Sequence, residues 1–96
     1  MKTKQQIMKL LAMNKPELEK RFGVKTLALF GSYARGDMRP DSDVDILVDV
    51  PPEIGLEFVT LADRLENLLG LPVELVSRRA INTQFYQSLE GEIEYV

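Results

Sequence analysis

The 96-residue sequence contains no cysteine and no histidine. These two absences exclude disulfides, metal sites built from thiolates or imidazoles, and catalysis by Ser-His-Asp or Cys-His groups. A metal ion bound by this chain would need oxygen ligands, which favours Mg²⁺, Mn²⁺ or Ca²⁺. A general base would have to be Asp, Glu, Lys or Tyr.

The sequence also lacks a long apolar run and an excess of basic residues. No segment approaches the ~20 apolar residues that a membrane-spanning helix needs. The basic N-terminal segment has neither a signal-like apolar core nor a small-residue cleavage site, so we expect a cytoplasmic protein without a membrane partner. The net charge of −3 provides no general attraction to nucleic acid, and duplex nucleic acid is not an expected partner.

Apolar residues make up 45% of the chain and charged residues 28%, the balance of a folded globular domain. The length fits a single domain over residues 1–96, with one modest core and room for one site. Little of the chain remains for a separate acceptor-binding domain.

Hydrophobic periodicity and turn residues predict an alternation of helices and strands. The predicted elements are, in chain order, a short amphipathic helix over residues 4–12, a second helix from an Asn14 N-cap to Phe22, a strand buried on both faces over residues 24–30, a loop over residues 31–40, a strand over residues 44–50, a helix that starts at Pro51–Glu53 and ends at Gly70, a strand over residues 72–76, a helix over residues 80–90 with Asn82 as N-cap, and an edge strand over residues 92–96. This order indicates an α/β (α+β) fold with a small mixed β-sheet flanked by helices.

Acidic residues stand at the start of the predicted strand 44–50. Asp43 and Asp45 are two residues apart, so both side chains project from the same face, with Cα atoms roughly 6.5–7 Å apart. Glu74 lies in the middle of the next predicted strand and joins this face if the two strands pair. Carboxylates held this close repel one another, and a divalent cation such as Mg²⁺ would supply the missing positive charge.

The segment Gly31-Ser32-Tyr33-Ala34-Arg35-Gly36 follows a buried strand directly. Gly31 allows the backbone to approach a ligand closely or to take a positive φ. Ser32 offers a hydroxyl and a backbone N–H, and Arg35 adds a planar cation suited to phosphate oxygens. Each of these residues, taken alone, is an ordinary turn or surface residue, and so are the acids. Their order and spacing together predict a site for phosphoryl or nucleotidyl transfer.

The motifs GSYARG at 31–36 and DSDVDILV at 41–48 resemble those of the minimal nucleotidyltransferases of the DNA polymerase β superfamily. The resemblance covers about residues 20 to 90. It implies that Gly31, Ser32 and Arg35 bind the nucleotide triphosphate and that Asp43 and Asp45 are catalytic metal ligands. The third acid of the family falls on Glu74, which would complete the metal site and accept the proton of the acceptor hydroxyl. The family usually has Asp at that place.

The same resemblance implies the substrates and the partner. ATP would be the substrate, with two Mg²⁺ ions, or Mn²⁺ in their place, as cofactors. Short members of the family often act as antitoxins that transfer AMP to a tyrosine of a HEPN-type toxin, in an assembly with that toxin or with further copies of the chain. Two alternatives stay open: a non-catalytic module that neutralises a partner by contact, and a nucleotidyltransferase acting on a small molecule or an RNA end.

Overall fold

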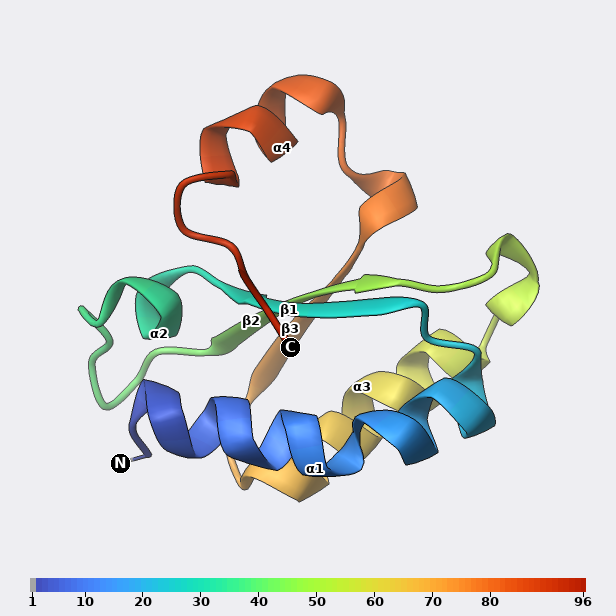
Figure 1. The fold of residues 1–96 in the computed structure, drawn as a ribbon, viewed down its shortest axis with the longest axis horizontal. Helices are drawn as coiled ribbons and strands as arrows, with labels where there is room; N and C mark the ends of the chain where they lie inside the picture. The colour runs from blue at the N-terminus through green and yellow to red at the C-terminus, as the bar shows by residue number, and fades with distance from the viewer. Residues whose placement is uncertain (1) are drawn as a thin grey trace.

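The computed structural model describes residues 2–96, which form a four-stranded mixed sheet with helices on both faces (Figure 1). The elements are α1 (Lys4–Phe22), β1 (Thr26–Phe30), α2 (Ser32–Arg35), β2 (Val44–Asp49), the 3₁₀ turn η1 (Pro52–Ile54), α3 (Glu57–Leu69), β3 (Val73–Ser77), the 3₁₀ turn η2 (Arg78–Ala80), α4 (Thr83–Leu89) and β4 (Glu94–Tyr95). The strand order is β3-β2-β1-β4; only β2 and β3 are parallel. The long helices α1 and α3 cover one face and α4 lies over the other.

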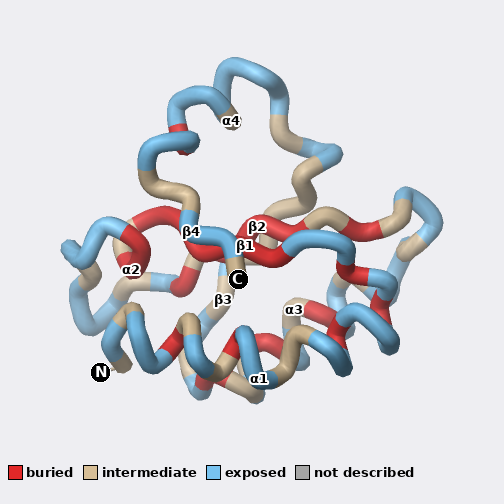
Figure 2. The backbone as a smooth tube through the Cα atoms, in the orientation of Figure 1, coloured by how far each residue is buried: buried red, intermediate tan, exposed pale blue. Residues whose placement is uncertain are grey.

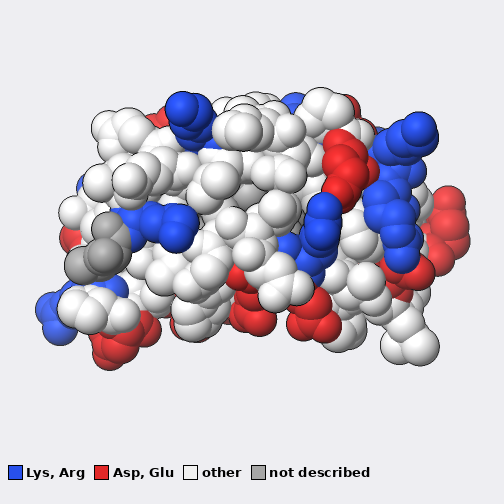
Figure 3. Space-filling view, turned by 90° about the horizontal axis from the view of Figure 1, so that it is seen from below, with Lys and Arg blue, Asp and Glu red and all other residues white. Residues whose placement is uncertain are grey.

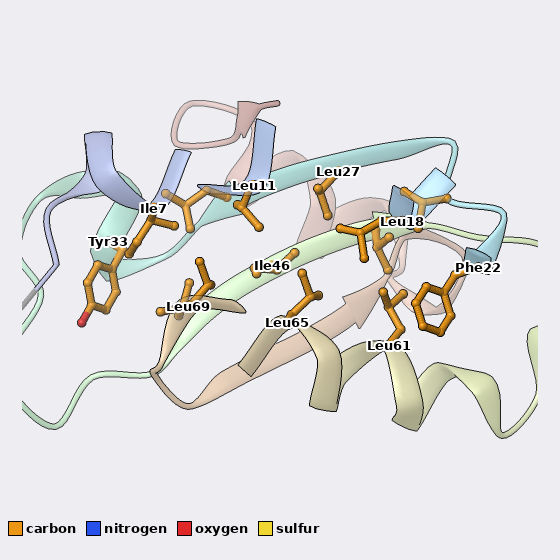
Figure 4. Packing of buried hydrophobic residues seen from close by; sticks show 14 of the residues in the cluster. Ile7, Leu11, Leu18, Phe22, Leu27, Tyr33, Ile46, Leu61, Leu65 and Leu69 are labelled. Carbon is orange, nitrogen blue, oxygen red and sulfur yellow. The ribbon is translucent and has the colours of Figure 1, made fainter. Parts of the chain in front are cut away.

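The main core lies between the sheet and the pair α1 and α3, where Figure 2 shows the buried parts of both helices turned toward the strands. Its fully buried side chains come from the sheet and from both helices that cover this face (Figure 4): Ile7, Leu11 and Leu18 of α1, Leu27, Leu29, Val44, Ile46 and Val48 of the sheet, and Leu61, Leu65 and Leu69 of α3. Burying each Leu or Ile contributes about 1.5–3 kcal/mol. This layer therefore holds the sheet in the position on which the site depends.

A smaller apolar cluster covers the opposite face of the sheet. Ala28, Phe30 and Leu47 point there and contact Leu89 of α4. The strands β1 and β2 are thus buried on both faces, which confirms the interpretation of the apolar run at residues 24–30. The alternation in β2 is also as predicted, because every second side chain enters the main core.

The predicted break between two N-terminal helices is wrong. The helix α1 runs through Asn14 and Pro16 without interruption, and a capping box at Thr3 begins it. Asn14 is not an N-cap; its side-chain amide donates to the Leu10 carbonyl at 2.8 Å. An internal proline costs a helix about 3 kcal/mol. The buried stripe that continues on both sides of Pro16 offsets this cost, and its members are Ile7, Leu11, Leu18 and Phe22.

The predicted helix start at Pro51–Glu53 is only a 3₁₀ turn. Gly55, with φ 56° and ψ −133°, separates this turn from α3, which begins at Glu57. The other predicted ends are confirmed: Gly70 ends α3, and the Asn82 side chain accepts the Phe85 N–H at 2.7 Å as the N-cap of α4. The predicted edge strand at the C-terminus pairs with β1 through two residues only.

Charged side chains of both signs are interspersed on the face formed by α1 and α3 (Figure 3). Arg21 of α1 and Glu57 of α3 form an ion pair at 3.2 Å, and Arg64 pairs with Glu17 between the same helices. Exposed pairs of this kind contribute only about 0–1 kcal/mol each. Among residues 2–96, no helix is both long and apolar enough to cross a membrane.

Candidate active site

Two of the three predicted acids meet across the pair of strands β2 and β3. Asp45 lies directly opposite Glu74 in the parallel register, and Asp43 immediately precedes β2. The neighbours of Asp45 in the strand, Val44 and Ile46, point into the main core, so the Asp45 side chain faces the α4 side of the sheet. The condition under which Glu74 joins this face, namely that the third strand pairs beside the second, is therefore met.

The environment of Asp45 is strongly unfavourable for negative charge. Burial raises the pKa of the Asp45 carboxyl from 3.8 to about 6, and the charge of Glu74, a hydrogen bond with Glu74 and the charge of Asp43 act in the same direction. Arg35 opposes this shift of the Asp45 pKa. Negative charge is thus concentrated where β2 and β3 meet, and a bound cation would relieve it.

The donor set at this position fits a hard divalent cation, because all three side chains offer carboxylate oxygens. Within residues 2–96, no three acidic side chains are gathered closely enough to form a complete metal site by themselves. Mg²⁺ commonly takes one or two carboxylates from a protein and completes its shell with water and substrate phosphates. Asp43, Asp45 and Glu74 suit a site of that partly built kind.

The end of β1 brings Gly31 against the acids. Phe30 pairs with Asp45 in the antiparallel register, and Gly31 follows with φ 76° and ψ −154°. Only glycine adopts this backbone conformation readily. A Cβ at position 31 would overlap the Asp45 carboxylate, with its carbon only 2.9 Å away. Glycine is therefore required at position 31 for two reasons: another residue would strain the backbone, and its Cβ would collide with the Asp45 carboxylate.

The single helical turn α2 fixes the segment that follows Gly31. Tyr33 and Ala34 are buried, and the Tyr33 ring reaches the main core (Figure 4). Gly36 ends the turn in the left-handed conformation and donates its N–H to the Ser32 carbonyl at 2.9 Å. Because its middle is anchored in the core, the turn holds Ser32 and Arg35 at the rim of the acidic site.

Arg35 is exposed, and its guanidinium is paired with two acidic side chains. Its Nε donates to Asp37 at 3.1 Å, and its Nη1 donates to Glu92 Oε2 at 2.9 Å. The same Glu92 oxygen accepts the Gly31 N–H at 2.6 Å. No sequence pattern indicated these contacts of Glu92, since an acid in an alternating C-terminal segment is typical of a solvent-facing strand residue.

A cleft of about 430 Å³ joins these groups. The acids and the two serines Ser32 and Ser42 line one side, and α4 contributes Phe85 and Leu89 to the other. Phe85 is 47% exposed although it is large and apolar. Phe85 and Leu89 were not predicted as site residues, because apolar residues on a short C-terminal helix are usually part of a core. The six predicted residues, in contrast, all line this cleft: Gly31, Ser32, Arg35, Asp43, Asp45 and Glu74.

A family model described as the nucleotidyltransferase domain matches residues 12–96 of the chain. The chain belongs to this nucleotidyltransferase family. The matched range includes the Gly31 turn, the acids of β2 and β3, and the α4 wall of the cleft. The family predicted from the two motifs is therefore confirmed, while the roles of the individual site residues remain predictions.

Relatives of this nucleotidyltransferase align over nearly its whole length. The protein adenylyltransferase MntA of Thermococcus cleftensis is 43% identical over 98 residues, covering 100% of this chain and 98% of that protein. The fold is similar to a chain in the crystal structure of a toxin–antitoxin pair with AMP-PNP, with a TM-score of 0.67 and 29% identity over 96% of this chain and 70% of that chain. It is also similar to a chain in the structure of a tri-AMPylated Shewanella oneidensis HEPN toxin in complex with an MNT antitoxin, with a TM-score of 0.58 and 27% identity over 96% of this chain and 66% of that chain. These similarities confirm the predicted fold class.

Proposed function

We propose that this chain is an antitoxin that transfers AMP from ATP to a tyrosine hydroxyl of a HEPN-type toxin. The observation that carries the proposal is the register of the sheet, which sets Asp45 opposite Glu74 and beside the Gly31 turn. The cleft gathers acidic side chains together with the Gly31 N–H and the Arg35 guanidinium. A reaction between a metal-bound triphosphate and a hydroxyl needs both kinds of group.

The proposed roles follow from the two kinds of group in the cleft, acidic side chains and hydrogen-bond donors. Asp43, Asp45 and Glu74 would hold Mg²⁺ (two ions, or Mn²⁺ in their place), which neutralises charge on the phosphate oxygens when bound. Gly31, Ser32 and Arg35 would bind the triphosphate, since a backbone N–H, a hydroxyl and a guanidinium all donate to phosphate oxygens.

The proposed transfer exchanges a phosphoanhydride bond of ATP for a phosphate ester bond to the acceptor. The acceptor oxygen forms a bond to the α-phosphorus of ATP, the bond from that phosphorus to the bridging oxygen breaks, and pyrophosphate leaves. The hydroxyl proton passes to a carboxylate, for which Glu74 is the candidate because it lies at the same edge of the sheet as Asp45. Glu is one methylene longer than the Asp usual in the family, which allows this carboxylate to reach further into the cleft.

The partner is inferred from the relatives and from the cleft. The Shewanella structure joins an antitoxin of this fold to a toxin that carries AMP groups. In the present chain the described residues form the sheet, its covering helices and the rim of the acidic cleft. We infer that the acceptor hydroxyl enters this cleft as part of a folded partner protein.

Mass spectrometry of the partner tests the proposal. A HEPN-type toxin that binds the chain is incubated with the chain, ATP and Mg²⁺, and the intact mass of the toxin is measured. The wild-type chain should add AMP, the variant Asp43→Asn/Asp45→Asn should add none, and Asp49→Asn should retain transfer because Asp49 does not line the cleft.

The same experiment separates the alternatives. If the double variant still neutralises the toxin without ATP, the chain is a binding antitoxin and the transfer proposal is wrong. If AMP appears on a small molecule or an RNA end and not on the protein, the acceptor class is wrong while the transferase activity stands.

A further inference from the structure

The carboxylate of Glu92 lies where two positively polarised groups of the cleft converge. Its Oε2 atom accepts the Gly31 N–H at 2.6 Å and an Arg35 N–H at 2.9 Å. The Glu92 side chain is only 19% exposed, whereas that of Arg35 is 47% exposed. One oxygen thus holds both donors, and these are groups that the proposed function gives to the triphosphate.

The position of Glu92 is unexpected on electrostatic grounds. It adds a fourth carboxylate to a cleft that already contains Asp43, Asp45 and Glu74. Like charges within a few ångströms repel, so a glutamate would favour open solvent unless specific donors held it. The Gly31 N–H and Arg35 supply such donors. The position between the Gly31 N–H and the Arg35 guanidinium, called the anion seat below, holds an anion in a cleft that also contains three acids. It therefore has the properties of an anion-binding site.

A carboxylate and a phosphate are interchangeable at such a seat. Both present oxygens with negative charge, and both accept charge-assisted hydrogen bonds from guanidinium and backbone N–H groups. The Cβ-free approach at Gly31 keeps its N–H open to whichever anion is present.

The backbone around Glu92 is anchored, so its side chain can leave without unfolding the C-terminal segment. The N–H of Glu92 donates to the Leu89 carbonyl at 2.9 Å, and Ile93 packs against the small apolar cluster below α4. The following strand β4 pairs with β1. Rotation of one side chain is enough to vacate the seat.

We propose that the Glu92 carboxylate occupies, in the nucleotide-free protein, the seat that a phosphate oxygen of the triphosphate takes between Gly31 and Arg35. Nucleotide binding then exchanges one anion for another, and Glu92 sets the apparent affinity for the nucleotide. The proposal rests on the proposed nucleotidyltransferase function and adds to it a residue that competes with the substrate.

The test compares Glu92→Gln with Glu90→Gln, which removes the same charge two residues away and outside the cleft. The probe is AMP-PNP with Mg²⁺, and its dissociation constant is measured by calorimetry. A neutral amide holds the two donors less strongly than a carboxylate, so Glu92→Gln should bind AMP-PNP about three- to tenfold more tightly than wild type. Glu90→Gln should stay within twofold of wild type.

The amide proton of Gly31 reports directly on the seat. In the free wild-type protein its NMR signal should lie downfield, as expected for a short bond to a carboxylate, and it should move upfield in Glu92→Gln. Adding AMP-PNP should return it downfield in the variant and change it little in wild type. The variant Glu92→Asp, one methylene shorter, should behave like Glu92→Gln at this amide.

Unchanged or weaker AMP-PNP binding by Glu92→Gln would overturn the proposal and leave the transferase function intact. A Gly31 signal insensitive to Glu92→Gln would overturn it as well. If AMP-PNP binds neither protein but inorganic triphosphate binds Glu92→Gln more tightly and shifts its Gly31 amide, the anion seat stands and the nucleotidyltransferase function fails.

Discussion

Replacing Gly31 by alanine is expected to destabilise the protein much more than the same change at Gly36. Both glycines have a positive φ, 76° and 85°. At Gly36 the backbone is in the ordinary left-handed region and an added Cβ meets nothing within 4 Å. Gly36→Ala should therefore cost only the backbone strain, about 1–2 kcal/mol.

Gly31→Ala carries two costs. Its φ and ψ lie near a region that is almost restricted to glycine, which costs about 1–3 kcal/mol. The new Cβ must also displace the Asp45 carboxylate, and forcing an atom into an occupied space costs typically about 1–3 kcal/mol more. We expect a loss of about 3 kcal/mol or more in the free energy of unfolding, together with loss of nucleotide binding. Urea denaturation in EDTA measures the first quantity without interference from metal.

A double-mutant cycle isolates the contact with Asp45. In an Asp45→Ala background the two nearest atoms, which belong to the carboxyl group, are gone, and the Cβ of residue 45 remains 3.1 Å from the new Cβ. The cost of Gly31→Ala should then fall by about 1–3 kcal/mol. Equal costs of Gly31→Ala in both backgrounds, or a Gly31→Ala cost no larger than that of Gly36→Ala, would refute the close approach of the turn to the acid.

Two further predictions concern charge and packing. The pKa of Asp45 is raised from 3.8 to about 6 in the folded chain. Between these two pH values the folded state holds a proton that the unfolded state has already released. The free energy of unfolding therefore falls as the pH rises through about 6. Asp45→Asn removes this loss, so in EDTA it should raise the thermal midpoint more at pH 8 than at pH 5. Asp49→Asn is the control. An equal change in the midpoint at both pH values would contradict the unfavourable environment assigned to the Asp45 carboxylate. In the main core, Leu65→Ala should cost about 2–5 kcal/mol in urea denaturation. Val59 lies on the same helix and is 60% exposed, so Val59→Ala should change the free energy of unfolding by no more than about 0.5 kcal/mol. Comparable losses for the two variants would show that the buried face of α3 is misassigned.

The parts of the molecule that could be predicted from the sequence are those where a local pattern and the tertiary structure require the same residues. The alternation in β2 fixes which side chains enter the core, and it thereby sends Asp45 to the opposite face. The apolar run of β1, buried between two layers, leads directly into Gly31. Both motifs of the site are attached to these two strands, so the positions of the acids and of the Gly31 turn followed from the strand assignment.

The N-terminal helix shows where local signals fail. Asn14 and Pro16 together are typical of a helix start, yet burial of side chains before and after them against α3 and the sheet favours one continuous helix. Packing contributes more than the local preference at these two positions. A single sequence does not reveal which of the two will prevail, because the competing contacts come from elements that follow later in the chain, β1, β2 and α3.

The role of Glu92 was not predictable for a related reason. Its hydrogen bonds to Gly31 and Arg35 span 61 and 57 residues of chain. They depend on the two-residue pairing of β4 with β1, which a short alternating segment does not specify. Phe85 likewise reaches the cleft only because α4 lies across the site.

The most direct test of the account is a crystal structure of the chain with AMP-PNP and Mn²⁺. The anomalous signal of Mn²⁺ locates the metal. The account predicts a peak in contact with the carboxylates of Asp43 and Asp45, with the triphosphate between that peak and the Gly31 turn. A peak away from both acids, or a nucleotide bound outside the cleft, would contradict it.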